Sequence, residues 1–277
     1  MKVVCIAGVG LIGGSFALAL REAGFDGKII GVSSPATVEK ALSLGVIDQA
    51  LPLSEAAALA DLVYLAQPIS QILTTLDDLD QYVRPGTLIT DAGSTKALIV
   101  KKAKETIRRG RFIGGHPMAG KESRGVEAAE ASLFRNRPYV LTEADPPLSG
   151  WIAKIGARLV ILDPEEHDRY VAVTSHLPQL LSTALASVIG HRDGSEEVAG
   201  PAACDLTRLA LSSYDIWRDI LDTNRESVQG AIEEMMAHLR QMQSELTGAS
   251  MEQAFVDGAK AARKIRSLGY PPSFGKP

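Results

Sequence analysis

The segment 112–120 combines residue types that could do acid–base chemistry. His116 follows a short apolar run and two glycines, and Pro117 comes directly after it. A loop of this kind at the carboxyl end of a strand faces the crevice in which open α/β sheets bind ligands. A histidine there can act as a general base near neutral pH. The same spacing also fits a histidine that caps a turn, so it leaves both interpretations open.

Ser94 and His176 are further candidates, because the chain is expected to start a helix or to bend beside them. Ser94 follows a strand candidate at 87–90. It can cap a helix that begins at Thr95, or it can hydrogen-bond a catalytic group in the same crevice. His176 lies two residues before Pro178, which removes a backbone donor from a helical pattern. A histidine beside such a kink is either a packing residue or part of a site.

Arg208 lies among apolar residues in the second half of the chain. It is either a surface arginine whose stem covers its apolar neighbours or a bidentate clamp for a carboxylate. The other histidines have polar surroundings and are expected to face solvent; they are His167, His191 and His238. We expect no metal site, because no two histidines have metal-ligand spacing and the chain has 2 cysteines.

A glycine-rich turn near the start of the chain predicts a dinucleotide site. The pattern G-x-G-x-x-G comes directly after an apolar strand candidate at 3–7 and opens a helical pattern at 11–23. The first glycine permits the tight turn, the second lets a pyrophosphate approach the backbone, and the third allows close packing. The helix N-terminus offers N–H groups to the phosphates. The candidate cofactor contacts here are Gly8, Gly10, Leu11, Ile12 and Gly13.

The end of the second strand candidate, 28–32, bears on the choice of cofactor. An NAD-binding chain usually has an acidic residue about 20 residues after the glycines, where it binds the ribose 2′-hydroxyl. Here Ser33, Ser34 and Thr37 follow the strand, and no acid is among them. Hydroxyl and backbone N–H groups can bind a 2′-phosphate, which a carboxylate would repel. We therefore expect NADP as the preferred cofactor, with NAD possible.

The first half of the chain alternates short apolar runs with helical patterns, which predicts the elements that position these residues. Strand candidates lie at 3–7, 28–32, 62–66, 87–90, 138–142 and 158–162, and helical patterns at 11–23, 36–44, 69–82 and 95–109. This alternation predicts an α/β fold with an N-terminal Rossmann-like, doubly wound and mostly parallel sheet. Gln67 and Pro68 follow the third of these strands and complete the candidate cofactor contacts.

Beyond residue 163 the pattern changes to helices alone. Helical patterns cover 168–190, 205–222 and 251–268. Pro271 and Pro272 are expected to end the last of them. We therefore predict a dinucleotide-binding domain over 1–163 and an all-helical C-terminal domain for substrate binding and dimerisation over 164–277.

A stripe of apolar residues lies between the helical patterns at 205–222 and 251–268. From Val228 to Leu246, apolar residues recur at steps of three and four. Such a stripe fits the core of the helical domain or the seam of a homodimer.

The composition narrows the class of protein. The chain has 277 residues, of which 45% are hydrophobic and 22% charged, and its net charge is −4. Without a basic surplus, we expect neither nucleic acid nor an anionic membrane as a partner. The N-terminal apolar run is too short for a signal peptide, and no stretch reaches the ~20 uncharged residues of a membrane span. These features predict a cytoplasmic globular protein.

Four motifs together resemble one family of enzymes. They are GVGLIGGS at 8–15, DAGSTK at 91–96, GHPMAG at 115–120 and SHLP at 175–178. In this order they are similar to the prephenate and arogenate dehydrogenases of tyrosine biosynthesis, over nearly the whole chain. The resemblance implies a small-molecule substrate, prephenate or arogenate, whose C4 gives hydride to a nicotinamide while the ring carboxylate departs as CO₂. It also implies a dimer and a reaction that needs no metal.

The resemblance implies a role for each candidate residue. His116 would accept the proton of the substrate's 4-hydroxyl, and Ser94 would orient His116 or bond the same hydroxyl. Arg208 matches an arginine that binds a substrate carboxylate, and His176 matches a histidine that lines the substrate pocket. Lys121, after the His116 segment, either contacts a substrate carboxylate or faces solvent.

Two other classes of protein fit parts of the pattern. A β-hydroxyacid dehydrogenase or an imine reductase also joins a Rossmann domain to a helical one. The former resembles chains with a catalytic lysine in a glycine- and asparagine-rich helix segment, and 168–246 contains no such segment. A non-enzymatic regulator that senses the nucleotide would leave the histidines without a chemical task. Turnover of a cyclohexadienyl substrate distinguishes these classes.

Overall fold

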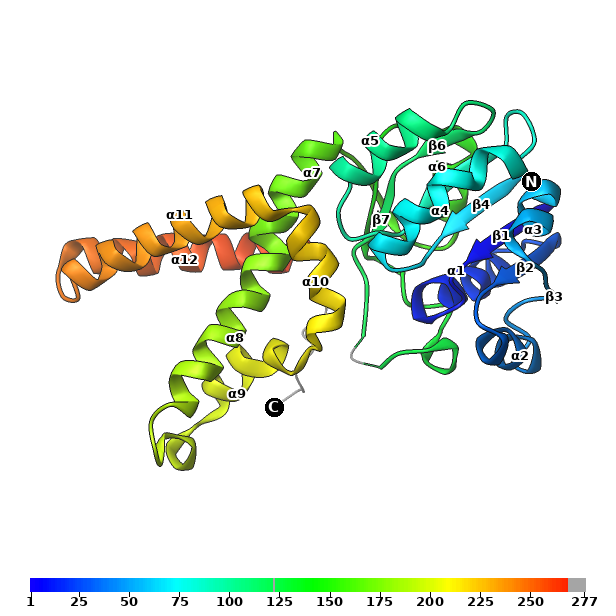
Figure 1. The fold of residues 1–277 in the computed structure, drawn as a ribbon. Helices are drawn as coiled ribbons and strands as arrows, with labels where there is room; N and C mark the ends of the chain where they lie inside the picture. The colour runs from blue at the N-terminus through cyan, green and yellow to red at the C-terminus, as the bar shows by residue number, and fades with distance from the viewer. Residues whose placement is uncertain (122, 269–277) are drawn as a thin grey trace.

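The computed structural model describes residues 1–121 and 123–268. The chain folds into an α/β part and a helical part that extends from one side of it (Figure 1). The α/β part ends with strand β9, whose last residue is Ile161, and the first helix of the helical part, α7, begins at Pro164. The predicted combination of a Rossmann-like sheet and a helical second part is confirmed.

The main sheet has six parallel strands in the order β3-β2-β1-β4-β5-β6. Its strands are β1 (Val3–Ala7), β2 (Lys28–Val32), β3 (Gln49–Ala50), β4 (Leu62–Leu65), β5 (Leu88–Asp91) and β6 (Arg111–Ile113). The helices that follow them are α1 (Leu11–Glu22), α2 (Pro35–Ser43), α3 (Leu53–Leu59), α4 (Ile69–Tyr82) and α5 (Ala97–Thr106). Helices cover both faces of the sheet, so its central strands are apolar runs without alternation.

The strand order reverses between β1 and β4, and this reversal places the predicted site. Ala7 pairs with Leu65, and Leu65 pairs with Asp91, so β1, β4 and β5 end at one edge of the sheet. The segments that follow these three strands therefore meet at the same edge. Open α/β sheets bind ligands in the crevice at such a switch point.

A second, three-stranded sheet carries His116. Its strands are β7 (Gly115–Pro117), β8 (Pro138–Leu141) and β9 (Arg158–Ile161), with a short 3₁₀ helix η1 (Val126–Ala128) and helix α6 (Pro146–Lys154) in between. β7 is antiparallel to β8, and His116 lies opposite Val140. The prediction of a loop at His116 is therefore wrong. Glycine and proline weaken the strand pattern there, but pairing with β8 supplies the hydrogen bonds.

The helical part begins with α7 and has more breaks than the sequence pattern suggested. Its helices are α7 (Pro164–Val171), the π-helix η2 (Ala172–His176), α8 (Leu177–Gly190), the 3₁₀ helix η3 (Ser195–Val198), α9 (Pro201–Thr207), the 3₁₀ helix η4 (Arg208–Leu211), α10 (Tyr214–Thr223), α11 (Arg225–Ser244) and α12 (Ala249–Ser267). The single helix predicted over 205–222 is therefore wrong. Ser213 caps a new helix there with its hydroxyl group, which accepts from the Asp215 N–H.

The predicted interruption near Pro178 takes the form of the π-helix η2. Pro178 lies in the first turn of α8 and has no N–H to donate to the Thr174 carbonyl. The wider turn just before it ends at His176. A π-turn changes the direction in which the side chains beside it point, and such turns are frequent at functional sites.

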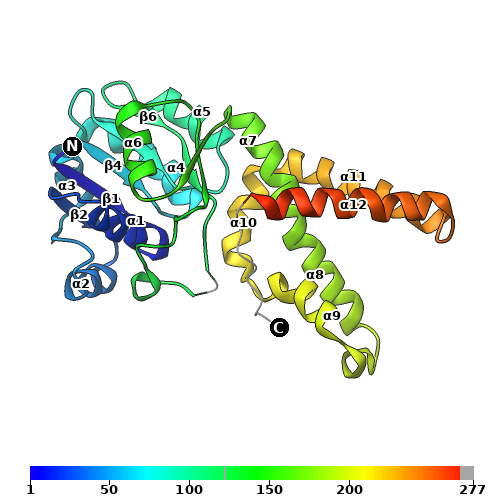
Figure 2. The same cartoon turned by 180° about the vertical axis from the view of Figure 1, so that it is seen from behind.

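The apolar stripe of α11 is buried at one end only. Val228 and Ala231 pack against the start of α8 and η2, whereas Leu239 and Met242 are exposed. The next helix, α12, is fully described, and none of its side chains is buried. Both helices extend away from the α/β part (Figure 2). The prolines expected to end the last helix, Pro271 and Pro272, lie outside the described residues.

Candidate active site

The glycine turn between β1 and α1 lets the backbone approach a ligand closely. Gly8 has a φ of +93°, a conformation that residues with side chains rarely adopt. A Cβ atom at Gly8 would lie 2.6 Å from the Ala66 carbonyl oxygen, and one at Gly13 would lie 2.0 Å from the Gly8 carbonyl oxygen. At Gly10 a Cβ atom would meet nothing within 4 Å, so the turn is open there. α1 has no side-chain cap, so its first N–H groups can bind a phosphate.

The other predicted cofactor contacts lie along the same edge of the sheet. They are Leu11 and Ile12 in the first turn of α1, Ser33 and Ser34 after β2, and Gln67 and Pro68 after β4. Ser34 caps α2, because its Oγ accepts from the Thr37 N–H, and it also lies 2.9 Å from the Thr37 hydroxyl. Two exposed hydroxyl-bearing residues, Ser33 and Ser34, thus stand where an acidic residue would bind a ribose. The residues present fit a nicotinamide dinucleotide at this edge.

β7 carries His116 into the interior, where its side chain has one histidine partner. His116 is 8% exposed, and its Nδ1 lies 2.8 Å from Nε2 of His167, a residue of α7. Burial first, and then the neighbouring His167 and Lys96, hold the pKa of His116 well below its usual value. His116 is therefore a neutral imidazole at pH 7.

Asp168 connects this histidine pair to the start of α5. Its Oδ1 lies 2.8 Å from Nδ1 of His167. The backbone N–H groups of Lys96 and Ala97 donate to its two carboxylate oxygens at 2.7 and 2.9 Å. Asp168 thus caps α5 from another part of the chain, and it links the helical part to a helix that packs on the main sheet.

Ser94 does not have the capping role that the sequence offered for it. α5 begins at Ala97 rather than Thr95, and no side chain at its own N-cap position bonds to it. Ser94 is half-buried in the segment that follows β5. The structure shows no hydrogen bond between the described side chains of Ser94 and His116. Ser94 therefore lies at the correct edge of the sheet, without a direct contact to the histidine.

A buried ion pair fixes the backbone next to His116. Lys96 and Asp91 form this pair, and both side chains are fully buried. Nζ of Lys96 donates to the Gly115 carbonyl oxygen at 2.7 Å, and the Gly115 N–H donates to Oδ1 of Asp91 at 3.0 Å. Burial lowers the pKa of Lys96, against the opposing charge of Asp91. Because both backbone groups of Gly115 are held, the start of β7 has a fixed position.

His176 joins the same network from the helical part. Asn224 donates from Nδ2 to the Asp168 backbone carbonyl at 2.7 Å, and the same Nδ2 lies 3.4 Å from Nδ1 of His176. The His176 ring packs edge to face on Trp217 of α10. Burial lowers the pKa of His176 to about 4, so this histidine is also neutral. The structure thus brings His116 and His176 into one connected cluster.

Arg208 and Lys121 lie on segments other than those that carry this cluster. Arg208 is exposed on η4, a segment that Gln179 anchors by donating to the Leu209 carbonyl oxygen at 2.8 Å. Ser182 of α8 anchors the same segment by accepting from a backbone N–H. Lys121 forms an ion pair with Glu130 on the segment that follows β7.

Sequence reasoning missed His167 and Asp168, and the expectation that His167 faces solvent is wrong. His167 is fully buried and Asp168 is 3% exposed. The two residues lie on the same face of α7 as Pro164 and Val171, at helical spacings of three and four. That spacing would have placed them on the buried face, and burial of two adjacent polar residues would have indicated a site.

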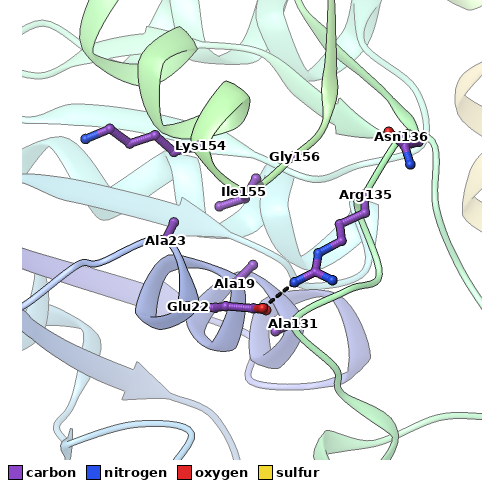
Figure 3. Close-up of a pocket in the computed structure, with 9 residues that line it drawn as sticks. All are labelled: Ala19, Glu22, Ala23, Ala131, Arg135, Asn136, Lys154, Ile155 and Gly156. Carbon is purple, nitrogen blue, oxygen red and sulfur yellow. Dashed lines mark hydrogen bonds and ion pairs between the residues drawn. The ribbon is translucent and has the colours of Figure 1, made fainter.

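A separate pocket lies at the far end of α1 from the glycine turn (Figure 3). It has a volume of about 280 Å³. Arg135 and Glu22 form an ion pair on its wall, and Lys154 and Asn136 line it as well.

Within residues 1–121 and 123–268, no group of three His, Cys, Asp or Glu side chains could hold a metal ion.

The geometry defines a class of protein. A dinucleotide site lies at the edge of the main sheet, and a buried neutral histidine beside it contacts the helical part. This arrangement suits a nicotinamide-dependent dehydrogenase. Comparison with known proteins identifies the family. Residues 16–169 match the family model "Prephenate dehydrogenase, nucleotide-binding domain", and residues 163–260 match "Prephenate dehydrogenase, dimerization domain". The chain belongs to the prephenate dehydrogenase family.

Individual relatives agree with this assignment. A prephenate dehydrogenase of Lactococcus lactis is 36% identical, over 99% of this chain and 80% of its own length. The crystal structure of a prephenate dehydrogenase from Aquifex aeolicus, in complex with hydroxyphenyl propionate and NAD⁺, is 31% identical with a TM-score of 0.86, covering 96% of this chain and 98% of that one. Synechocystis arogenate dehydrogenase is 30% identical with a TM-score of 0.78, over the same shares of the two chains.

The predicted class of reaction is therefore confirmed. The protein is a nicotinamide-dependent dehydrogenase that catalyses an oxidative decarboxylation of the prephenate or arogenate type. Its helical part carries the family's dimerization domain. Within residues 1–121 and 123–268, none of the helices has the length and apolar character to cross a membrane.

Proposed function

We propose that His116 is the general base of this reaction. The observation that carries the proposal is a buried histidine, held neutral, on a strand beside the carboxyl edge of the main sheet. A neutral imidazole can accept the proton of the substrate's 4-hydroxyl, which favours the departure of hydride from C4. The electron pair of the bond between C1 and the ring carboxylate then enters the ring. CO₂ leaves, and the C4 oxygen, now a phenolate, takes the proton back from His116 to give a phenol.

The cofactor and the substrate would use different parts of the site. When bound, the nicotinamide supplies the hydride acceptor, and its pyrophosphate would lie on Gly8, Gly10, Gly13 and the N-terminus of α1. Asn224 donates to Nδ1 of His176, so the proton of that neutral ring is on Nε2 and can bind a substrate oxygen. Such a donor helps to hold the substrate without taking its proton.

Three further residues are proposed around the substrate. Arg208 would bind a substrate carboxylate with its planar guanidinium group. Ser94 would bind the 4-hydroxyl or orient His116 once substrate is present. Lys121 would reach a substrate carboxylate only by exchanging Glu130 for it, because these two side chains are paired.

We propose NADP as the preferred cofactor, with NAD as the alternative. The support is the end of β2, where Ser34 and Thr37 present hydroxyl groups and no carboxylate. A 2′-phosphate would accept hydrogen bonds from such groups. Comparing the kcat/KM values obtained with NADP and with NAD tests this preference directly.

We propose a homodimer formed through the helical part. Its support is the exposed apolar stripe on α11, together with α12, none of whose side chains is buried.

We also propose that the chain divides near residue 163, into a dinucleotide-binding domain and a helical domain that binds substrate. A cytoplasmic location is supported by the unpaired Cys5 and Cys204.

The first experiment follows reduced nicotinamide by its absorbance, with prephenate and arogenate each tested against NAD and NADP. His116→Asn is expected to lower kcat by at least about 10²-fold, the lower end of what a positioned base contributes, and to leave the Kd of the cofactor unchanged. Undiminished turnover by this variant would contradict the role of His116. Absence of turnover in all four wild-type assays, with cofactor binding shown separately, would contradict the proposed reaction.

A further inference from the structure

We propose that His167 and Asp168 are positioning residues that fix the tautomer of His116. The proposal rests on the proposed role of His116 as the base. It is carried by three groups in a row: the Asp168 carboxylate, the His167 ring and the His116 ring. The two contacts between them are both 2.8 Å long, and all three side chains are buried.

The direction of the hydrogen bonds follows from the Asp168 end of the row. The Asp168 carboxylate accepts from two backbone N–H groups at the start of α5, so it presents only acceptor atoms to His167. Nδ1 of His167 must therefore carry the proton and donate it. In the proposed arrangement the His167 ring carries this one proton, so its Nε2 is an acceptor and Nδ1 of His116 donates to it. Nε2 of His116 is left with the lone pair that a general base needs.

The same row supports the charge that forms on His116 during the reaction. When Nε2 takes the substrate proton, the positive charge strengthens the bond from Nδ1 to His167. The charged and titratable groups that face His116 are Lys96 before α5, His176 in η2, and His167 in α7. Lys96 is already paired with Asp91, whereas the Asp168 carboxylate is in line with the new charge.

Kinetic constants of two His167 variants test the proposal. His167→Leu removes the acceptor, so kcat is expected to fall by at least about 10²-fold, while KM and the Kd of the cofactor stay within about twofold. His167→Gln offers Oε1 near the place of Nε2, and it is expected to restore kcat to within about tenfold of the wild type. The control is His191→Gln, a change of an exposed histidine on the surface.

A measurement on the wild-type protein does not depend on activity. Nitrogen-15 NMR of the histidine rings in the full chain distinguishes a protonated from an unprotonated ring nitrogen. We expect His116 and His167 both to carry the proton on Nδ1 at pH 7.5, with His116→Asn and His167→Gln used to assign the signals. A proton on Nε2 of His116 overturns the proposal. So does a wild-type kcat in His167→Leu, or a His167→Gln variant no better than His167→Leu.

The failures of the two proposals can be separated. If wild-type protein turns over neither substrate, the proposed function fails, and the tautomers measured by NMR still test the row. If His116→Asn loses activity but His167→Leu does not, the base stands and the positioning role is wrong.

Discussion

At the scale of single residues, burial decides the chemistry of His116. Because the site favours the uncharged ring, the pKa of His116 lies well below its usual value. In its proposed role as base, His116 is active in the neutral form, so activity should be lost only when pH falls through this lowered pKa. We expect kcat/KM to stay level from pH 8 down to about 6.5, the ordinary pKa of histidine, and to fall only at lower pH. A pH profile that falls with a midpoint at or above 6.5 would contradict this assignment.

The sequence identified single residues of the site to the extent that each had a local signal. His116 and His176 stand beside glycine or proline, and the structure brings them into one cluster. Asp168 has no such signal, because its partners Lys96 and Ala97 are about 70 positions away and meet it only in the folded chain. Residues that act through long-range contacts need the tertiary structure to be found.

At the scale of elements, the packing of α1 against β1 depends on Gly13, the third glycine of the motif. A Cβ atom at Gly13 would lie 2.0 Å from the Gly8 carbonyl oxygen, so Gly13→Ala must push the helix away from the strand. We expect it to lower the free energy of unfolding by about 1–3 kcal/mol, as overpacking does, and to weaken cofactor binding. Urea unfolding and cofactor titration measure both effects.

A matched control exists in α6. Gly150 lies inside a helix, and a Cβ atom there would meet nothing within 4 Å. Gly150→Ala should therefore raise the free energy of unfolding, by about 0.5–1 kcal/mol. Equal stability of the two variants would show that the turn tolerates a side chain at Gly13.

The exposed apolar stripe of α11 leads to a prediction about dimerisation. Leu239 is 52% exposed in one chain, which a dimer contact would explain. Leu239→Lys should place a charge in that contact and shift the protein toward monomer at micromolar concentration. Light scattering coupled to gel filtration measures the mass. Ala237→Lys, on the opposite face of the same helix, should leave the mass unchanged, and an unchanged mass for both would argue against this seam.

The sequence predicted elements well where the apolar pattern alone determines them. It predicted them less well where a helix is interrupted by contacts with other parts of the chain. The strands at 3–7 and 28–32 agree with β1 and β2, because buried parallel strands are continuous apolar runs. The region 205–222 reads as one amphipathic helix, yet η4 and the cap at Ser213 divide it. The contact of η4 with α8 outweighs the local preference for one continuous helix, and no sequence pattern announces that contact.

At the scale of the whole molecule, buried neutral histidines couple stability to pH. The folded pKa values of His116 and His176 lie below the value of about 6.5 in an unfolded chain, so the unfolded chain binds more protons below that pH. Their contribution is fully present above pH 6.5 and is lost as pH falls. We expect the free energy of unfolding to drop by about 2–3 kcal/mol between pH 7.5 and 5.5. Urea titrations at one fixed protein concentration measure it, and equal values at both pH values would contradict the prediction.

The contact between His116 and His167 joins the second sheet to α7, the first helix of the helical part. His167 lies within 163–169, where the matches to the two family models overlap. The α/β part and the helical part are therefore not expected to be interchangeable between relatives. A recombinant that took its sheets from one ancestor and its helical part from another would receive the proposed base from the first parent. It would receive the hydrogen-bond partner of that residue from the second. If the two residues act as proposed, selection acts on the pair, and changes on either side of this 2.8 Å contact are expected to be accepted together or not at all.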